Sequence, residues 1–273
     1  MSRQIALILT LLMLAVPSSS KAQISVRSQL SQDTSAQPGE SYVGSILIRN
    51  DTDEIQQAKI YQTDYLFQSD GSNYFGDPGT IERSNAKWID VASSSMMVPP
   101  REAIEVSYRV NVPMDVDAEP LQGSYWSIIM VEGIPKSSPE NIENDVPDDA
   151  LGIIQVTRYG VQVATHIDGT GAANLTISES ALSKSEGNIA SLQLSVANEG
   201  DKLVRPEIWV ELYDEAGNAL GRIDGVNNRI YPGTSVKQQI ELGKLEIGRY
   251  RALVIMDAGD DEVFAAEYNL NID

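Results

Sequence analysis

Few side chains in this sequence are of the kinds that catalyse reactions. His166 is the single histidine of the 273 residues, and cysteine is absent. A Ser-His-Asp arrangement would have to use His166, thiol catalysis is excluded, and one histidine cannot build a zinc site of the usual composition. His166 ends a predicted strand beside a glycine-rich turn, where a structural or solvent-facing role is the simpler interpretation. The sequence also contains no glycine-rich phosphate-binding loop.

Carboxylates are the other groups that could do chemistry. A glycosidase needs two of them across a cleft, and no pair is distinguished here by its spacing. Loops 70–73 and 257–262 concentrate the oxygen ligands that hard cations prefer. Neither loop matches the twelve-residue EF-hand pattern, and hairpin turns explain both. We therefore expect no catalytic residue, no metal site and no cofactor, and we do not expect an enzyme.

The charge of the chain restricts its partners. Its 39 acidic residues against 20 Lys and Arg give a formal charge of −19. Such a chain repels nucleic acid and anionic lipid, whose binding depends on Lys and Arg. The acidity favours solubility and basic partners, and adaptation to a salty habitat explains it equally well. We expect no nucleic-acid partner.

The first 22 residues have the pattern of an export signal. An apolar run spans residues 5–16, Pro17 ends it, and small residues precede a cleavage site after Ala22. The run is shorter than the roughly 20 apolar residues that span a bilayer. We predict cleavage after Ala22, no transmembrane segment in the remaining chain, and a location in the periplasm or at the cell surface. An uncleaved N-terminal anchor is the alternative.

The elements that would position any site are β-strands. Short runs of alternating polar and apolar residues are bounded by Gly, Pro, Asn and Asp, and none shows a sustained period of 3.6. The clearest predicted strands are residues 42–49, 54–67, 104–112, 124–132, 153–167, 174–180, 190–197, 207–214, 235–242, 250–257 and 263–272. Evenly spaced strands of this kind predict sandwiches.

Two patterns occur twice in the same order. Tyr125 and Tyr250 each stand where a tyrosine corner would join strand F to the preceding connection. Asn50 and Asn198 each end an alternating strand. Such repetition indicates related domains. We predict an all-β chain with two tandem immunoglobulin-like β-sandwich domains after the cleaved signal peptide.

The predicted domains are residues 23–168 and 169–273, with the junction at the glycine-rich turn 168–171. Residues 136–150 are polar and acidic, and we place them in the first domain as a long F–G loop, because the strand that follows must supply strand G. The three tryptophans lie in or beside predicted strands, where large residues belong to the core. They are Trp88, Trp126 and Trp209.

The first half combines a strand that ends at Asn50 before an acidic turn, an aromatic strand from Tyr125 that runs into Pro135, a long polar loop and an extended last strand. With a cleavable signal and two immunoglobulin-like domains, these features resemble the periplasmic chaperones of chaperone–usher pili. In that family, exposed apolar residues of strand G complete the fold of an incomplete subunit by strand donation.

This resemblance implies partner-binding residues. Ile154 and Val156 are the best match to the donated apolar side chains. The family holds the C-terminal carboxylate of its subunit with one basic residue on strand A and one on strand G, for which Arg27 and Arg158 are the nearest candidates. Ile154 and Val156 also fit the ordinary core of a strand G, and that alternative stays open.

The Pro-Gly-Glu run at 38–40, the Asp-Gly pair at 70–71 and Pro113 before Gly123 carry a second resemblance. They are similar to bacterial surface proteins that interact with WxL-domain partners and peptidoglycan. We therefore predict a non-enzymatic binding protein of the cell envelope, chaperone-like in assembling or presenting surface or pilus structures by β-strand pairing with a protein partner. The alternative is a surface adhesion module that binds peptidoglycan or polysaccharide.

Overall fold

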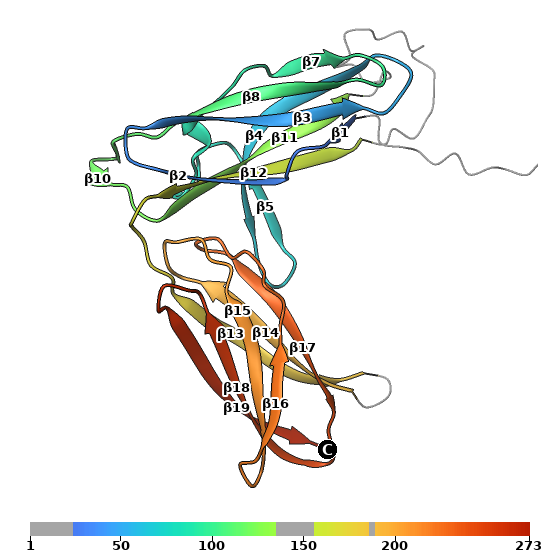
Figure 1. The fold of residues 1–273 in the computed structure, drawn as a ribbon, viewed down its shortest axis with the longest axis vertical. Coiled ribbons are helices and arrows are strands. Elements are labelled where there is room, and N and C mark those ends of the chain that lie inside the picture. The colour runs from blue at the N-terminus through green and yellow to red at the C-terminus, as the bar shows by residue number, and fades with distance from the viewer. Residues whose placement is uncertain (1–23, 135–155, 186–188) are drawn as a thin grey trace, which may run out of the picture.

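The computed structural model describes residues 24–134, 156–185 and 189–273, which form two groups of β-strands in succession (Figure 1). Among these residues there is no α-helix, and the one short helical turn is the 3-10 helix η1 (Ala86–Trp88). Each group is a sandwich of two main sheets. The predicted all-β class with two tandem sandwiches is confirmed for this part of the chain. No helix within it is long and apolar enough to cross a membrane.

The first sandwich packs a four-stranded sheet against a six-stranded one. The four-stranded sheet has the order β1 (Ile24–Val26), β3 (Ser41–Asn50), β8 (Ala103–Asn111), β6 (Ile89–Val91). The six-stranded sheet has the order β2 (Ser31–Ala36), β12 (Arg158–Ile167), β11 (Ser124–Ile134), β4 (Gln56–Phe67), β5 (Asn73–Gly76), with β7 (Ser95–Val98) also on β4. A separate ribbon pairs β9 (Asp115–Val116) with β10 (Glu119–Pro120).

The second sandwich has three strands against four. The three-stranded sheet has the order β13 (Leu175–Lys184), β14 (Ile189–Asn198), β17 (Ser235–Lys244). The four-stranded sheet has the order β16 (Ala219–Asp224), β15 (Glu207–Asp214), β18 (Gly248–Asp257), β19 (Val263–Ile272).

Each core follows from the two-residue period of its strands. In β8, Val106, Tyr108 and Val110 are buried and the residues between them are exposed. In β15, Ile208 and Val210 point inward in the same way. Burying one such side chain stabilises the fold by about 1.5–3 kcal/mol, so alternation alone places these strands.

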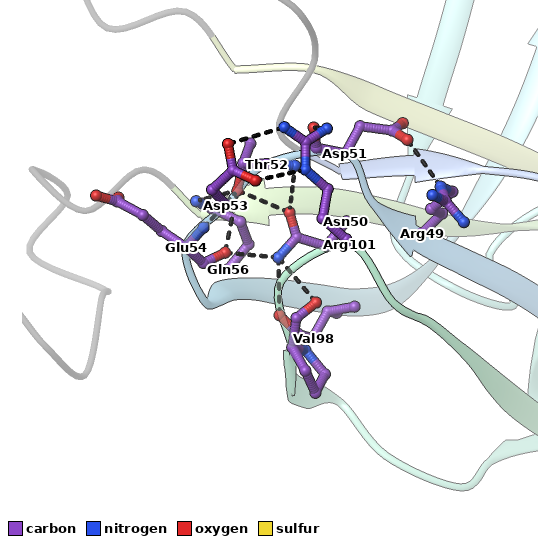
Figure 2. A network of polar contacts seen from close by, with 10 residues as sticks. Arg49, Asn50, Asp51, Thr52, Asp53, Glu54, Gln56, Val98 and Arg101 are labelled. Atoms are coloured by element: carbon purple, nitrogen blue, oxygen red, sulfur yellow. Dashed lines mark hydrogen bonds and ion pairs between the residues drawn. The ribbon is translucent and has the colours of Figure 1, made fainter.

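The Asn that ends β3 is a buried connector (Figure 2). The Asn50 amide nitrogen donates to the carbonyls of Glu54 at 2.7 Å and Val98 at 3.0 Å. Its amide oxygen accepts the N–H of Thr52 at 2.9 Å. One side chain therefore fixes the turn after β3 and ties it to the end of β7.

Asn198 repeats this arrangement at the end of β14. Its nitrogen donates to the carbonyls of Lys202 at 2.8 Å and Ile230 at 3.0 Å, and its oxygen accepts the N–H of Gly200 at 3.0 Å. The offsets of two and four residues match those around Asn50. The sequence repeat is thus a structural repeat.

The two tyrosines differ. The hydroxyl of Tyr250 donates to the carbonyl of Glu246 at 3.0 Å, as a tyrosine corner requires. The ring of Tyr125 instead packs on Trp88, with centroids 4.6 Å apart. Its hydroxyl has no hydrogen-bond partner within the described ranges, so the corner predicted for Tyr125 is wrong.

Trp88 and Trp126 are buried, as predicted. Trp209 is only half-buried and lies outside the core of its sandwich, under the guanidinium of Arg222 at 4.1 Å. The core prediction for Trp209 was wrong because its neighbours Ile208 and Val210 take the inward positions of β15.

Candidate functional site

Strand β12 is covered along its whole length on one side and along part of it on the other. It pairs antiparallel with β11 from Arg158 to His166. On the opposite side β2 runs parallel to it and covers only Gln162 to Ile167. The first contact on that side is the Gln162 N–H, which donates to the Leu30 carbonyl at 2.8 Å. We call the side of residues 156–161 that β2 leaves uncovered the β12 edge.

The β12 edge exists because the N-terminal chain changes sheets. β1 pairs with β3 in the opposite sheet, and the Arg27 N–H still donates to the Leu47 carbonyl there at 2.8 Å. The chain then crosses to the second sheet and begins β2 at Ser31. The crossing residues cannot pair with both sheets, so β2 does not reach the first residues of β12.

Backbone direction shows which groups face out. Gly133 donates its N–H to the Thr157 carbonyl at 3.4 Å, so the backbone groups of Thr157 point toward β11. The backbone N–H of Gln162 points the other way, toward the chain that leads into β2. Because backbone groups alternate along a strand, the N–H and C=O of Gly160 point out of the β12 edge. They have no hydrogen-bond partner in the described part of the chain. Such groups form a template for another strand.

Apolar side chains lie beside Gly160. Ile128 and Met130 are both buried there, and a Cβ on residue 160 would lie 3.1 Å from Cγ2 of Ile128 and 3.5 Å from Sδ of Met130, so the position is closely packed. Val156 is 37% exposed. It precedes β12, which begins at Arg158, so the predicted start of this strand at residue 153 does not hold for residues 156 and 157. Ile154 lies outside the described residues.

The two predicted basic residues are each held by a carboxylate of their own. Arg158 donates to Glu132 at 2.8 and 3.3 Å, and this hydrogen bond is the largest cause that lowers the pKa of Glu132. Arg27 donates to Asp51 at 2.8 Å. The pKa of Asp51 is lowered most by the hydrogen bond from Ser25 and then by the hydrogen bonds from Arg49 and Arg27. No described contact joins Arg27 to Arg158.

Farther along β12, the second domain packs onto the outward face of the sheet. The ring of Tyr231 stacks on Trp126, with centroids 4.0 Å apart and an angle of 28° between planes. The Tyr231 hydroxyl donates to Gln162 at 2.9 Å. Ala164 completes this small buried cluster. The contacts of Tyr231 with β12 begin at Gln162, and the pairing of β2 with β12 begins at the same residue. The part of β12 that neither β2 nor the second domain covers therefore ends at Gln162.

A polar group flanks this joint. Arg229 of the second domain forms a bidentate ion pair with Asp33 of β2. Burial raises the pKa of Asp33, but the adjacent imidazole of His166 and the hydrogen bonds and charge of Arg229 outweigh burial and hold that pKa well below its usual range. The arrangement is a charged clamp between the domains.

His166 does meet a serine and an aspartate. Its Nδ1 lies 2.9 Å from Oγ of Ser124, and its Nε2 lies 3.7 Å from the Asp33 carboxylate. Ser124 is only 1% exposed, and its oxygen accepts the Leu203 N–H at 2.8 Å. This serine therefore bonds the second domain to the first and presents no accessible nucleophile. Within the described ranges, no group of three acidic or histidine side chains could hold a metal ion.

No protein-family model matches the sequence, and no curated protein is similar to it in sequence. Solved structures have a similar fold. One is a chain of the chaperone–tip adhesin complex of CFA/I fimbriae biogenesis, 12% identical, with 90% of this chain and 98% of that chain covered and a TM-score of 0.49. A second is the class 5 fimbriae chaperone CfaA, 12% identical, with 89% and 98% covered and a TM-score of 0.46. A third is the YadV chaperone, 14% identical, with 92% and 100% covered and a TM-score of 0.42. The likeness is one of fold alone, and it is to pilus chaperones, the first family that the sequence resembles.

Sequence reasoning missed Gly160, Arg229 and Tyr231. The position of Gly160 matters only because β2 begins opposite Gln162, and β2 has no alternating pattern that would reveal it. Tyr231 precedes the Pro232-Gly233 turn, whose sequence signals a connection and nothing about the partner domain. Each of these roles depends on contacts distant in the chain.

Proposed function

We propose that this chain is a non-enzymatic binding protein of the cell envelope that captures an extended segment of a surface or pilus subunit by strand pairing at the β12 edge. The observation that carries the proposal is that β2 begins only opposite Gln162, while the backbone groups of Gly160 point to the side that β2 does not cover. The predicted export signal puts this activity in the periplasm or at the cell surface.

The mechanism is addition of a strand. A segment of the partner lies beside residues 156–161, in line with β2, and its backbone bonds to the outward N–H and C=O of Gly160. The exposed side chain of Val156 supplies an apolar contact, and Ile154 is proposed to supply another. Backbone pairing gives affinity, and these side chains set which partner segment fits.

The contact between the two domains would set where a captured strand ends. Tyr231 occupies the outward face at Gln162, and Leu30 occupies its edge. A captured strand must therefore end at that point, which gives the binding site a defined terminus and the partner a defined register.

The test is to block the edge without disturbing the sheet. Gly160→Pro removes the outward N–H and adds a ring, whereas Gly160→Ala adds a Cβ and keeps the N–H. Both variants are co-expressed with candidate surface or pilus subunits, and co-purification is measured. We expect capture by wild type and Gly160→Ala, and none by Gly160→Pro. Equal capture by Gly160→Pro would refute strand pairing at this edge.

A second candidate function is adhesion to peptidoglycan or polysaccharide. Tyr74 and Phe75 are 50% and 58% exposed on the edge strand β5, and Phe75 lies against Tyr65 with ring centroids 4.8 Å apart. Exposed rings of this kind suit stacking on sugars. Binding to insoluble peptidoglycan that Phe75→Ala abolishes and Gly160→Pro leaves intact would favour adhesion over strand capture.

A further inference from the structure

The strand β19 ends its sheet without the devices that normally protect an edge. The second sandwich has three other lateral strands. β13 is interrupted by a bulge between Ile177 and Glu179, and β16 pairs through a register shift and contains Gly221 at a φ of 136°. β17 also pairs through a register shift and contains two lysines. β19 pairs with β18 in unbroken register over its full length. It contains neither proline nor lysine. Proteins commonly use bulges, proline or lysine to prevent pairing between edges.

The outward backbone groups of β19 can be identified. Ala258 donates its N–H to the Glu262 carbonyl at 2.9 Å, so the backbone carbonyl of Glu262 points toward β18. By alternation, the N–H and C=O groups that point away from β18 belong to the odd-numbered residues. These are Val263, Ala265, Glu267, Asn269 and Asn271. None of these groups has a hydrogen-bond partner in the described ranges, and β19 lies at the outer side of the lower domain in Figure 1.

The inward side chains next to this edge are incompletely covered. Phe264 and Tyr268 are half-buried members of the rim of the core. Ile177 and Leu182 of β13, the edge strand of the facing sheet, are half-buried as well. A strand added to β19 would place its inward side chains beside Phe264 and Tyr268 and cover them.

We propose that β19 pairs antiparallel with β19 of a second copy of this chain, about a twofold axis through Tyr268. A twofold axis between two identical edges gives a closed dimer, with one continuous sheet through both copies. Because the outward groups are on odd residues, this axis pairs them with one another. This axis sets Ala266 opposite Leu270 and Phe264 opposite Ile272. Both inward-facing pairs are therefore apolar, and the first combines a small side chain with a large one.

Charge complementarity favours this register. An axis through Glu267 would place two carboxylates directly opposite each other, which is destabilising. The axis through Tyr268 instead places Glu267 opposite Asn269 of the other copy. Arg251 of β18 is the cross-strand partner of Asn269. Each Glu267 would then lie one strand away from an arginine of the other copy, within reach of that long side chain.

The first test blocks the edge in the whole exported chain. Sedimentation equilibrium is run at about 0.15 M salt, where repulsion between acidic chains is screened beyond about 8 Å. Ala265→Pro removes an outward N–H of β19. Ala219→Pro is the matched control at the opposite edge of the sheet, since the bond from the Asp214 N–H to the Asn218 carbonyl leaves the Ala219 N–H pointing outward. We expect a reversible dimer whose dissociation constant rises about tenfold or more in Ala265→Pro, because both copies lose a donor, and stays unchanged in Ala219→Pro. A monomer at every concentration, or equal effects of the two prolines, would overturn the proposal.

The second test reads the register directly, because the chain has no cysteine. In Tyr268→Cys, the cysteine of one copy would lie opposite the same cysteine of the second copy. This pair is not hydrogen-bonded, so its Cα atoms would be about 4.5 Å apart, a separation that a disulfide spans. Ala266→Cys is the control, since residue 266 faces residue 270. We expect a covalent dimer on oxidation of Tyr268→Cys only. No covalent dimer from Tyr268→Cys, or one from Ala266→Cys, would overturn this register. Gly160→Pro leaves β19 untouched, so failure of strand capture and failure of dimerisation are separate results.

Discussion

The N–H of Gln162 donates to the carbonyl of Leu30 across 2.8 Å, and this bond divides β12 into a covered and an open part. After it, β2 follows β12 to Ile167. Before it, the N-terminal chain has just left the opposite sheet, where Arg27 bonds to Leu47. The crossing of the chain between sheets thus leaves part of β12 beyond the reach of β2, and this is where we propose that a partner strand pairs.

Replacing Ile154 and Val156 together with Asp should abolish partner capture and leave the fold intact. Val156 is 37% exposed, so a carboxylate there stays hydrated in the free protein. A captured strand would bury it at a cost of several kcal/mol. A thermal melt and co-purification measure both effects, with Val43→Asp on the exposed face of β3 as the control. A collapsed melting temperature would show that these residues belong to the core.

Replacing Arg158 with Ala should weaken capture less, by about 1.5–3 kcal/mol for one charge-assisted contact. The same change should raise the pKa of Glu132, because the hydrogen bond from Arg158 is the largest cause that lowers it. NMR titration of Glu132 measures that shift. An unchanged pKa of Glu132 in Arg158→Ala would contradict the ion pair, and Arg158→Lys should give an intermediate value.

Asn50→Ala and Asn198→Ala should destabilise the protein to similar extents. Each removes a buried amide and leaves at least two carbonyls and one N–H without their partner. We expect a loss of about 2 kcal/mol or more in the free energy of unfolding for each. Denaturant titration measures it, and Asn111→Ala on the surface should stay within about 0.5 kcal/mol. If Asn198→Ala is as mild as Asn111→Ala, the two asparagines are not equivalent.

Asp33→Asn should destabilise the protein mainly above about pH 4. The pKa of Asp33 is held below its usual value of about 3.9. A depressed carboxyl pKa stabilises the fold above the unfolded pKa, and that contribution is lost as pH falls through the folded pKa. With solvent screening at this partly exposed pair we expect about 1 kcal/mol.

Thermal unfolding of wild type and Asp33→Asn as a function of pH checks this expectation. The difference between them should be largest near neutral pH and shrink in acid. Arg229→Gln should cost about as much, and the double variant should cost less than the sum, because the two residues form one pair. Additive costs, or a difference that grows in acid, would contradict the clamp.

Much of the fold could be predicted from strand alternation. The predicted strands 207–214 and 263–272 coincide with β15 and β19. The strands that were missed have little pattern of their own. β1 has three residues, and β2 reads Ser-Gln-Asp-Thr-Ser-Ala, which is a strand because β12 pairs with it. Pairing with a distant strand supplies what local sequence does not.

The candidate site, like the fold, was predictable from the sequence only in part. The resemblance to pilus chaperones pointed to Val156, and its role in binding stays a prediction. Gly160 could not be predicted, because its importance comes from where β2 begins. The clamp between Asp33 and Arg229 joins residues of two domains with no shared sequence pattern. Contacts between domains lie beyond what periodicity can indicate.

Hydrogen exchange at the Gly160 amide tests strand capture most directly. In the free protein this N–H points out of the β12 edge, so it should exchange quickly, whereas Val161 and Val163, which point toward β11, should exchange slowly. In the complex with a captured subunit, the Gly160 amide should slow by about tenfold or more, because a backbone hydrogen bond now protects it. An amide that exchanges at the same rate in the free and bound protein would contradict strand pairing at this edge.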